Sequence, residues 1–406
     1  MLEIPMVTHK RLQGNIVLPA SKSLSNRYLI IRAIEGSDTQ IKNLSASHDT
    51  MILQQALEAE NDERNFEDAG TPLRLYLAYA CLKDLRVSID GFPGLRKRPL
   101  APLLKALEQL GAEFGYLQEP YSLPLVIKKG IDISRNEVVI DAGMSSQFLS
   151  ALLLIAPAFD RGLTIISSGR ISSEPYIDLT MDAMRKAGVE VREGNGTYSV
   201  QPGPYVLADS PEIESDWSAA TFIYAMAAVS DEVNLLIDNL DMRSLQGDAL
   251  TAKIFESFGV SSSIEGRGIR LSKTGDAVKE FEVDVTHIPD MFPALCAVCA
   301  ALRIPAGFTG IKNLRLKESD RVNAMQVNLE QVAVHLQHEG DDKVLLEYGV
   351  VPDIRQYRFK SFGDHRIAMA CSIFAFSKDT VIDDEEVVRK SFPGYWDLFF
   401  EFTQNT

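Results

Sequence analysis

The stretch Leu18-Pro-Ala-Ser-Lys-Ser-Leu-Ser-Asn-Arg27 joins a predicted strand at residues 15–18 to a predicted apolar helix at residues 28–34. A strand-to-helix junction exposes backbone N–H groups at the positive end of the helix dipole, where anions bind well. Lys22 adds a compact cation to this junction, and Arg27 adds a planar fork that suits phosphate or carboxylate. A serine-rich helix cap with two surface cations is the alternative that this stretch alone leaves open.

The composition is that of an ordinary globular protein with an acidic balance. The 406 residues are 46% hydrophobic and 24% charged, which is enough for two or three domains. The net charge of -15 argues against nucleic acid or an anionic membrane as the main partner. The four cysteines show no disulfide spacing, no signal-peptide pattern opens the chain, and the apolar runs are too short to span a bilayer. We therefore expect a cytoplasmic protein.

Apolar helices that follow polar motifs recur along the chain. The predicted helices begin near Asn26, Gly70, Ser145, Trp217, Asp290 and Asp364. After the second of these, the spacing settles at roughly 72 to 74 residues, which is typical of a repeated supersecondary unit. A second series of predicted helices interleaves with the first, and each ends at a glycine, except that the last has Ala333 at that place. Such long units predict two globular domains rather than a solenoid, with the best boundary in the proline-rich, acidic segment 201–216.

Anion-binding groups recur at the predicted helix starts. They lie in the blocks Asp68–Arg74, Gly94–Pro99, Ser145–Gln147, Asn313–Arg321, Asp364–Arg366 and Arg389–Lys390. Each block alone could be a solvated charged surface, but their recurrence at corresponding positions predicts an anion-binding cleft. Asp290 and Glu318 stand among these cations and can act as a base or as charge partners, with a helix cap and a salt bridge as the alternatives. No nucleotide motif or metal-ligand spacing occurs, so we expect no cofactor and no metal.

With these motifs in order, the chain resembles the 5-enolpyruvylshikimate-3-phosphate synthase family over essentially its whole length. Leu18–Arg27 and Lys317–Arg321 are similar to the two family signatures. Further similar motifs are Ala69–Thr71, Arg98–Pro99, Ser145–Leu149, Ser173–Asp178, Leu245–Asp248, His287–Asp290, Asp364–Arg366 and Lys390–Pro393. The resemblance implies an α/β enolpyruvyl transferase fold, in which six βαβαββ repeats form two similar domains with the active site in the cleft between them. It places residues 1–19 with 216–406 in one domain and residues 20–215 in the other.

The resemblance also implies an enzyme of the shikimate pathway, which leads to chorismate and the aromatic amino acids. The family transfers the enolpyruvyl group of phosphoenolpyruvate to the 5-hydroxyl of shikimate 3-phosphate and releases phosphate, by addition and elimination through a tetrahedral intermediate. These two small molecules are the implied partners, and we expect a monomer.

The family motifs imply roles for individual residues. The residues implied to bind shikimate 3-phosphate are Lys22, Ser23, Arg27, Ser145, Ser146, Gln147, Ser173, Asp290, Asn313 and Lys317. Those implied to bind phosphoenolpyruvate are Lys22, Gly70, Arg98, Gln147, Arg321, Arg366 and Lys390. Asp290 is the implied base near the 5-hydroxyl, Glu318 the implied proton donor to the methylene carbon, and Lys22 the implied stabiliser of charge in the intermediate.

Two residues depart from the family pattern. Asp68 stands where the family usually has asparagine, and it would repel a bound anion unless a cation such as Arg74 or Arg98 pairs with it. Pro72 follows Gly70-Thr71 and stiffens that loop. The alternatives to the implied function are the sister transferase that acts on UDP-N-acetylglucosamine, and an inactive anion-binding paralogue. The loop before Arg98 lacks the cysteine of the former, and the joint presence of an acid and a base argues against the latter.

Overall fold

The structure is a computed structural model that describes residues 1–141, 143, 145–169, 173–207, 210–351 and 353–404. The chain forms two compact units. Unit 1 comprises Met1–Pro19 with Glu214–Thr406, and unit 2 comprises Ala20–Ile213. Residues 208 and 209 of the proline-rich boundary segment lie outside the described residues.

Unit 2 contains two four-stranded sheets of the same topology. In spatial order, the first consists of β3 (Glu63–Asn65), β4 (Ser88–Asp90), β6 (Leu125–Lys129) and β5 (Glu113–Tyr116). The second consists of β7 (Glu137–Asp141), β8 (Leu163–Ser168), β10 (Thr197–Val200) and β9 (Val191–Gly194). In each sheet the first two strands are parallel and the remaining pairings are antiparallel. A helix therefore connects the parallel pair, and a hairpin completes the sheet.

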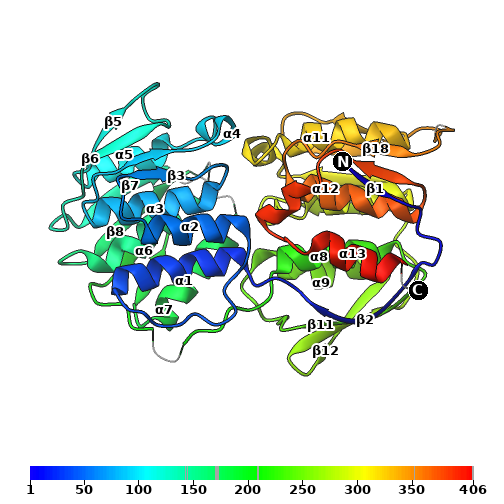
Figure 1. Cartoon of the computed structure of the whole chain (residues 1–406), viewed down its shortest axis with the longest axis horizontal. Coiled ribbons are helices and arrows are strands. Elements are labelled where there is room, and N and C mark those ends of the chain that lie inside the picture. The colour runs from blue at the N-terminus through cyan, green and yellow to red at the C-terminus, as the bar shows by residue number, and fades with distance from the viewer. Residues whose placement is uncertain (142, 144, 170–172, 208–209, 352, 405–406) are drawn as a thin grey trace. The chain divides into compact units, whose positions relative to one another are not determined.

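Unit 1 repeats this topology twice and adds a smaller sheet. Its four-stranded sheets are β2 (Arg11–Val17), β11 (Glu232–Asp238), β13 (Gly268–Lys273) and β12 (Val260–Glu265), and then β14 (Phe281–Asp284), β15 (Ala306–Thr309), β17 (Lys343–Tyr348) and β16 (Val334–His338). The smaller sheet is β1 (Leu2–Ile4), β19 (Thr380–Ile382) and β18 (Tyr357–Phe359). The N-terminal strand β2 runs parallel to β11, with Arg11 opposite Glu232 and Val17 opposite Asp238 (Figure 1).

Four of the six expected repeats thus carry a complete set of strands, and the other two are reduced. In unit 1 the reduced repeat is the three-stranded sheet, in which β1 pairs antiparallel with β19. In unit 2 only an isolated bridge between Lys42 and Glu212 takes the corresponding place among the described residues.

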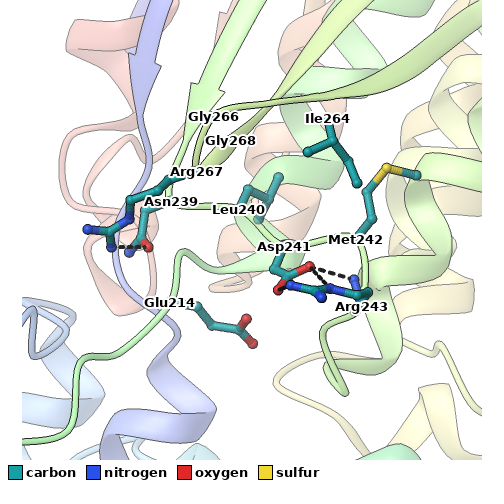
Figure 2. Close-up of a pocket in the computed structure, with 10 residues that line it drawn as sticks. All are labelled: Glu214, Asn239, Leu240, Asp241, Met242, Arg243, Ile264, Gly266, Arg267 and Gly268. Atoms are coloured by element: carbon teal, nitrogen blue, oxygen red, sulfur yellow. Dashed lines mark hydrogen bonds and ion pairs between the residues drawn. The ribbon is translucent and has the colours of Figure 1, made fainter.

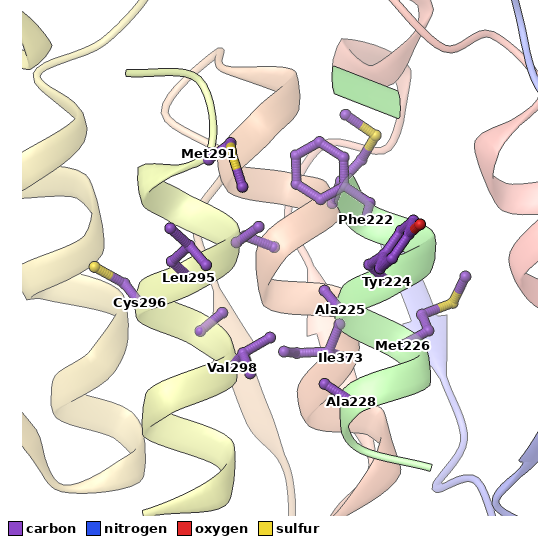
Figure 3. Close-up of a cluster of buried hydrophobic side chains, with 14 of the residues drawn as sticks. Phe222, Tyr224, Ala225, Met226, Ala228, Met291, Leu295, Cys296, Val298 and Ile373 are labelled. Atoms are coloured by element: carbon purple, nitrogen blue, oxygen red, sulfur yellow. The ribbon is translucent and has the colours of Figure 1, made fainter. Parts of the chain in front are cut away.

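Apolar helices form the centre of each unit. In unit 2 they are α1 (Lys22–Glu35), α3 (Gly70–Leu82) and α6 (Ser146–Ile155), and in unit 1 they are α8 (Trp217–Ala228), α10 (Phe292–Leu302) and α12 (His365–Ser372). Within unit 2 α3 packs against α1 and α6, and within unit 1 α10 packs against α8 and α12. Figure 3 shows Leu295 and Val298 of α10 facing Ala225 and Ala228 of α8, with Ile373 between them. α3, α6, α8 and α10 are apolar on nearly every side, and each unit buries its own hydrophobic core around them.

The remaining helices are shorter or more amphipathic. The α-helices are α2 (His48–Glu58), α4 (Pro93–Arg96), α5 (Ala101–Gln109), α7 (Pro175–Lys186), α9 (Thr251–Ile254), α11 (Arg321–Leu329) and α13 (Tyr395–Gln404). The 3₁₀ helices are η1 (Ala156–Ala158), η2 (Gly247–Leu250), η3 (Phe255–Phe258), η4 (Lys312–Leu316), η5 (Glu330–Val332), η6 (Ile373–Phe376) and η7 (Glu386–Lys390). Across the described part of the chain, no helix combines the length and apolarity that crossing a membrane requires.

Candidate active site

The polar motifs predicted at the helix starts cap those helices and place other motif residues in the first turn. The side chains of Ser21 and Ser145 accept backbone N–H bonds at the starts of α1 and α6. Asp364 caps α12 in the same way, by accepting the backbone N–H of Arg366. Side-chain capping is therefore present at all three helix starts, as the cap interpretation of the Leu18–Arg27 stretch predicted for its serines, but the two cations of that stretch are largely buried and not surface cations. Capping does not exclude a binding role for the neighbours of these three residues, because the first helical turn is where an anion finds backbone donors.

In unit 2, Lys22 is held by a carboxylate that sequence reasoning missed. Its Nζ lies 2.9 Å from Oδ2 of Asp49, and both side chains are largely buried, with 12% and 2% of their surfaces exposed. Asp49 lies in the first turn of α2, 27 residues away, so no local pattern pairs it with Lys22. An ion pair in this setting fixes the ammonium group at the start of α1.

Arg27 is almost completely enclosed by protein oxygens. Its Nε donates to the Thr180 hydroxyl at 2.7 Å, Nη1 to the Ser23 carbonyl, and Nη2 to Ser150 and to the Tyr176 carbonyl. Only 2% of Arg27 is exposed, and burial lowers its pKa to about 10. These bonds use four of the five N–H donors of the guanidinium group, and the predicted contact of Arg27 with shikimate 3-phosphate stays a prediction.

Two arginines lie close to Gly70 at the start of α3. A Cβ atom at this glycine would lie 2.6 Å from Cζ of Arg98 and 2.9 Å from Nη1 of Arg74. Arg74 donates to the carbonyls of Gly70 and Pro99, which ties this helix start to the loop that carries Arg98. The predicted Gly70 and Arg98 therefore lie together, and Arg74 is a support that the Asp68–Arg74 block already contained.

The α6 start lies beside the α3 start. The side-chain amide of Gln147 donates to the Thr71 hydroxyl at 2.8 Å. Ser146 is buried in the first turn of α6, next to the capping residue Ser145. Ser173 is also buried, one residue before Glu174, the N-cap of α7, and has the positive φ of 59° that a non-glycine residue rarely adopts. Unit 2 thus gathers hydroxyl, amide and cationic groups at adjacent helix starts.

In unit 1, Arg321 binds three carboxylates. Its Nη1 donates to Asp290 at 2.6 Å, its Nη2 to Glu318 at 2.9 Å and its Nε to Asp364 at 2.8 Å. Only 1% of the Arg321 side chain is exposed. Burial by itself lowers its pKa, but the three carboxylates raise the pKa well above its ordinary value. The salt bridge foreseen for Glu318 is therefore present.

Asp290 links Arg321 to a second arginine. Its Oδ2 accepts from Nη2 of Arg366 at 2.8 Å, while its Oδ1 accepts from Arg321. Burial favours the neutral acid, but Arg366, Arg321 and Lys317 hold the pKa of Asp290 well below its usual value. The helix-cap interpretation of Asp290 is wrong, because the N-cap of α10 is Met291 and no side chain caps this helix.

The other predicted residues of unit 1 lie on neighbouring elements. Lys317 follows η4, which contains the half-buried Asn313 and packs against α11. Lys390 is buried at the end of η7, which packs against α12. In the described part of the chain, no group of three or more His, Cys, Asp or Glu side chains could hold a metal ion.

Unit 1 also has a surface pocket that none of the predicted site residues lines. Its volume is about 310 Å³, and its wall comes from Glu214, the 239–243 loop, and the β12–β13 hairpin. Figure 2 shows Arg267 turned to Asn239 and Arg243 turned to Asp241, so hydrogen bonds and an ion pair hold both cations within the wall.

Comparison with known proteins decides the family. The model of the family described as EPSP synthase (3-phosphoshikimate 1-carboxyvinyltransferase) matches residues 6–59 and 52–399. The chain belongs to the EPSP synthase family. A 3-phosphoshikimate 1-carboxyvinyltransferase from Bacteroides fragilis is 36% identical over 394 residues, which cover 95% of this chain and 94% of the relative. One from Colwellia psychrerythraea is 32% identical, with 95% and 96% covered.

A solved structure of an EPSP synthase agrees with this membership. The enzyme from Acinetobacter baumannii superposes with a TM-score of 0.77 at 21% sequence identity, covering 99% of this chain and 98% of that one. The expected enolpyruvyl transferase fold and the resemblance to the EPSP synthase family are therefore confirmed.

Proposed function

We propose that the residues gathered at the helix starts of the two units carry out the reaction of the EPSP synthase family. The chain is a transferase of aromatic biosynthesis that moves the enolpyruvyl group of phosphoenolpyruvate to shikimate 3-phosphate. In the addition step, the 5-hydroxyl oxygen attacks C2 of phosphoenolpyruvate while C3 gains a proton. In the elimination step, the new methyl group loses a proton and phosphate leaves. The proposal assigns residues from both units to these two steps.

The observation that carries the proposal is the sharing of one carboxylate between two buried arginines. Asp290 bridges Arg321 and Arg366, and its single charge partly compensates the two guanidinium groups that the family motifs assign to phosphoenolpyruvate. A substrate carboxylate has the same charge and the same two oxygen acceptors as Asp290, so it can replace Asp290 on these arginines. Arg321 and Arg366 alone could bind many anions. Displacement of Asp290 from them also provides a base, which the transfer reaction needs and simple anion binding does not.

Substrate binding would thereby activate Asp290. While Arg366 and Arg321 hold its pKa well below the usual value, Asp290 is a weak base. Once a substrate anion compensates these arginines, the burial of Asp290 raises its pKa, and it can accept the proton of the 5-hydroxyl. Glu318 also loses part of its compensation from Arg321, so it can hold a proton for delivery to the methylene carbon. Lys22, fixed by Asp49, would stabilise negative charge in the intermediate.

The remaining motif residues bind the substrate phosphates and carboxylates in this proposal. We assign Ser23, Arg27, Ser145, Ser146, Gln147, Ser173, Asn313 and Lys317 to shikimate 3-phosphate together with Lys22 and Asp290. We assign Gly70, Arg98, Gln147, Arg321, Arg366 and Lys390 to phosphoenolpyruvate together with Lys22. Buried hydroxyls and amides at helix starts, as at Ser146 and Ser173, support the phosphate assignment, because such groups donate to phosphate oxygens without adding charge.

The first experiment measures phosphate release from purified protein with phosphoenolpyruvate, with and without shikimate 3-phosphate. We expect release only when shikimate 3-phosphate is present. UDP-N-acetylglucosamine serves as the control acceptor and should give no release. Release with the control acceptor instead would favour the sister transferase, and release with neither would favour an inactive paralogue.

Replacing Asp290 separates its proposed role as a base from its ion pairs. We expect Asp290→Asn to lower kcat by about 10² to 10⁴, the usual loss for a general base. The KM for phosphoenolpyruvate should stay level or fall, because Arg366 loses its internal competitor. Steady-state kinetics with both substrates varied measures the two effects.

Asp241→Asn is a suitable control for this variant, because Asp241 is paired with Arg243 near the surface of the same unit. It should leave both constants unchanged. An Asp290→Asn enzyme with near-normal kcat would remove Asp290 from the base role.

We also infer a reducing compartment and a monomeric state. The four cysteines, Cys81, Cys296, Cys299 and Cys371, are buried free thiols, as expected for a cytoplasmic protein.

Light scattering after size-exclusion chromatography tests the monomeric state, and a mass of twice 45.0 kDa would contradict it.

A further inference from the structure

Asp248 is a buried carboxylate in unit 1 to which the reaction assigns no role. It belongs to the motif Leu245–Asp248 and lies in η2, with 3% of its surface exposed. Its Oδ2 accepts a hydrogen bond from the Ser218 hydroxyl on α8. Within the described part of the chain, no donor bonds to Oδ1. A carboxylate in such a place is costly, so its retention needs an explanation.

Two residues of the candidate active site, Asp290 and Arg366, are among the charged groups that act on Asp248. Asp216, the N-cap of α8, and Asp290, just before α10, oppose its negative charge, while Arg366 on α12 favours it. Burial and Asp290 raise the pKa of Asp248 to about 6, against the opposing effects of Arg366 and Ser218. Arg366 thus has two carboxylates in its surroundings: Asp290 in direct contact, and Asp248 acting through its charge.

The loop that carries Asp248 is held in place by Gln246. The Gln246 amide donates to the Ser215 carbonyl and to Glu214, and its oxygen accepts the backbone N–H of Trp217. Because these bonds tie the loop to the start of α8, the loop holds Asp248 in this position. Because Asp248 is held in place, a change in the charge around it should change its protonation state and not its position.

We propose that Asp248 is a positioning residue that sets how tightly Arg366 holds an anionic substrate. The ionised carboxylate of Asp248 compensates part of the positive charge of Arg366, so Arg366 binds an added anion less tightly. The protonated acid has no charge and does not weaken this binding. Binding and protonation are reciprocal, so an anion on Arg366 favours the protonated form of Asp248 and, where Asp248 is ionised, its binding is accompanied by uptake of up to one proton from solvent. The inference rests on the proposed function, in which phosphoenolpyruvate binds Arg366.

The test is the pH profile of the KM for phosphoenolpyruvate in the full chain and in Asp248→Asn. Asparagine is similar in size and cannot ionise, so it resembles the protonated acid. We expect the ratio of the wild-type KM to the variant KM to be about 1 at pH 5. The ratio should rise to roughly three to ten at pH 8, with a much smaller change in kcat. Taking the ratio cancels the titration of the substrate's own phosphate, which is the same in both measurements.

Ser218→Ala provides an independent variant that should shift the pH profile of the KM to higher pH, whereas Asp248→Asn should remove the contribution of Asp248 to it. This variant lacks the hydrogen bond that stabilises the ionised carboxylate. Its KM for phosphoenolpyruvate should therefore begin to rise at a higher pH than the KM of the wild type. This variant also keeps the proposal testable if Asp248→Asn does not fold.

Two outcomes would overturn the inference while the enzyme stays active. One is that the KM for phosphoenolpyruvate depends on pH in the same way in the wild type, Asp248→Asn and Ser218→Ala. The other is that the substitutions lower kcat and leave this KM unchanged. A wild-type chain that releases no phosphate with shikimate 3-phosphate would instead overturn the proposed function, before any variant is compared.

Discussion

At Gly70 the missing side chain lets two guanidinium groups lie against the start of a helix. Any Cβ at this position would overlap the space of Arg98, and Arg74 is nearly as close. Because the Arg98 guanidinium group is the nearest to the added methyl group, and Arg74 is bonded to the carbonyls of Gly70 and Pro99, the substitution should displace Arg98. A single methyl group therefore tests whether the position of Arg98 matters for phosphoenolpyruvate.

We expect Gly70→Ala to raise the KM for phosphoenolpyruvate about tenfold, because one charge-assisted hydrogen bond is worth about 1.5 kcal/mol or more. The KM for shikimate 3-phosphate should change much less. Gly94→Ala is a matched control in the same segment as Arg98, since nothing lies within 4 Å of a Cβ placed at Gly94. Equal effects of the two variants, or an unchanged KM in Gly70→Ala, would place the phosphoenolpyruvate site elsewhere.

The sequence identifies the cations of the site better than their partners. Glu318 and Arg321 share one motif, so their salt bridge was open to prediction from spacing. Asp49 lies 27 residues from Lys22, and Asp364 lies 43 residues from Arg321. These pairs form only when separate helix starts come together, and no local pattern encodes that approach.

At the scale of elements, the chain keeps its repeat even where the residue type is unfavourable. The helices of the second series end in left-handed residues, with φ of 100° at Gly111, 85° at Gly188 and 72° at Gly259. Ala333 stands at the corresponding place and has φ of 54°. An L-residue in this conformation costs roughly 1 kcal/mol, whereas glycine adopts it freely. The repeated geometry is thus imposed at Ala333 by the packing around it.

We expect Ala333→Gly to leave stability unchanged or to raise it by up to about 1 kcal/mol, because relief of backbone strain offsets the lost methyl group and the added chain entropy. Ala324→Gly in the neighbouring α11 is the control, and it should destabilise the chain by about 1 kcal/mol or more. Urea unfolding followed by circular dichroism measures both. A loss in Ala333→Gly as large as that in the control would mean that the left-handed residue carries no strain.

The element boundaries show where local propensity fails. The helix expected at residues 28–34 is α1, which begins six residues earlier at Lys22. Serine and asparagine are poor helix formers, so the sequence favours a loop there. Ser25, Asn26 and Arg27 are nevertheless buried, and that tertiary packing determines their conformation. The reverse occurs at residues 251–258, where an amphipathic pattern divides into α9 and η3.

At the scale of the whole molecule, the two hydrophobic cores are separate sets of residues. One cluster contains the buried residues of unit 1 and the other those of unit 2. The two tryptophans of the sequence, Trp217 and Trp396, are both in unit 1. Tryptophan fluorescence therefore reports on unit 1 alone, whereas far-ultraviolet circular dichroism reports on both units. This asymmetry makes the cooperativity of the chain measurable without a label.

We expect a core truncation in one unit to lower the stability of that unit first. Leu153 on α6 and Leu295 on α10 are fully buried in the cores of unit 2 and unit 1. Each Leu→Ala change should cost its own unit about 2 to 5 kcal/mol, because it leaves a cavity that the core only partly fills. Leu153→Ala should then separate the two signals in urea, with circular dichroism changing before fluorescence, whereas Leu295→Ala should bring the fluorescence transition to lower urea. If either variant shifted both signals together, the two units would unfold as one cooperative block despite their separate cores.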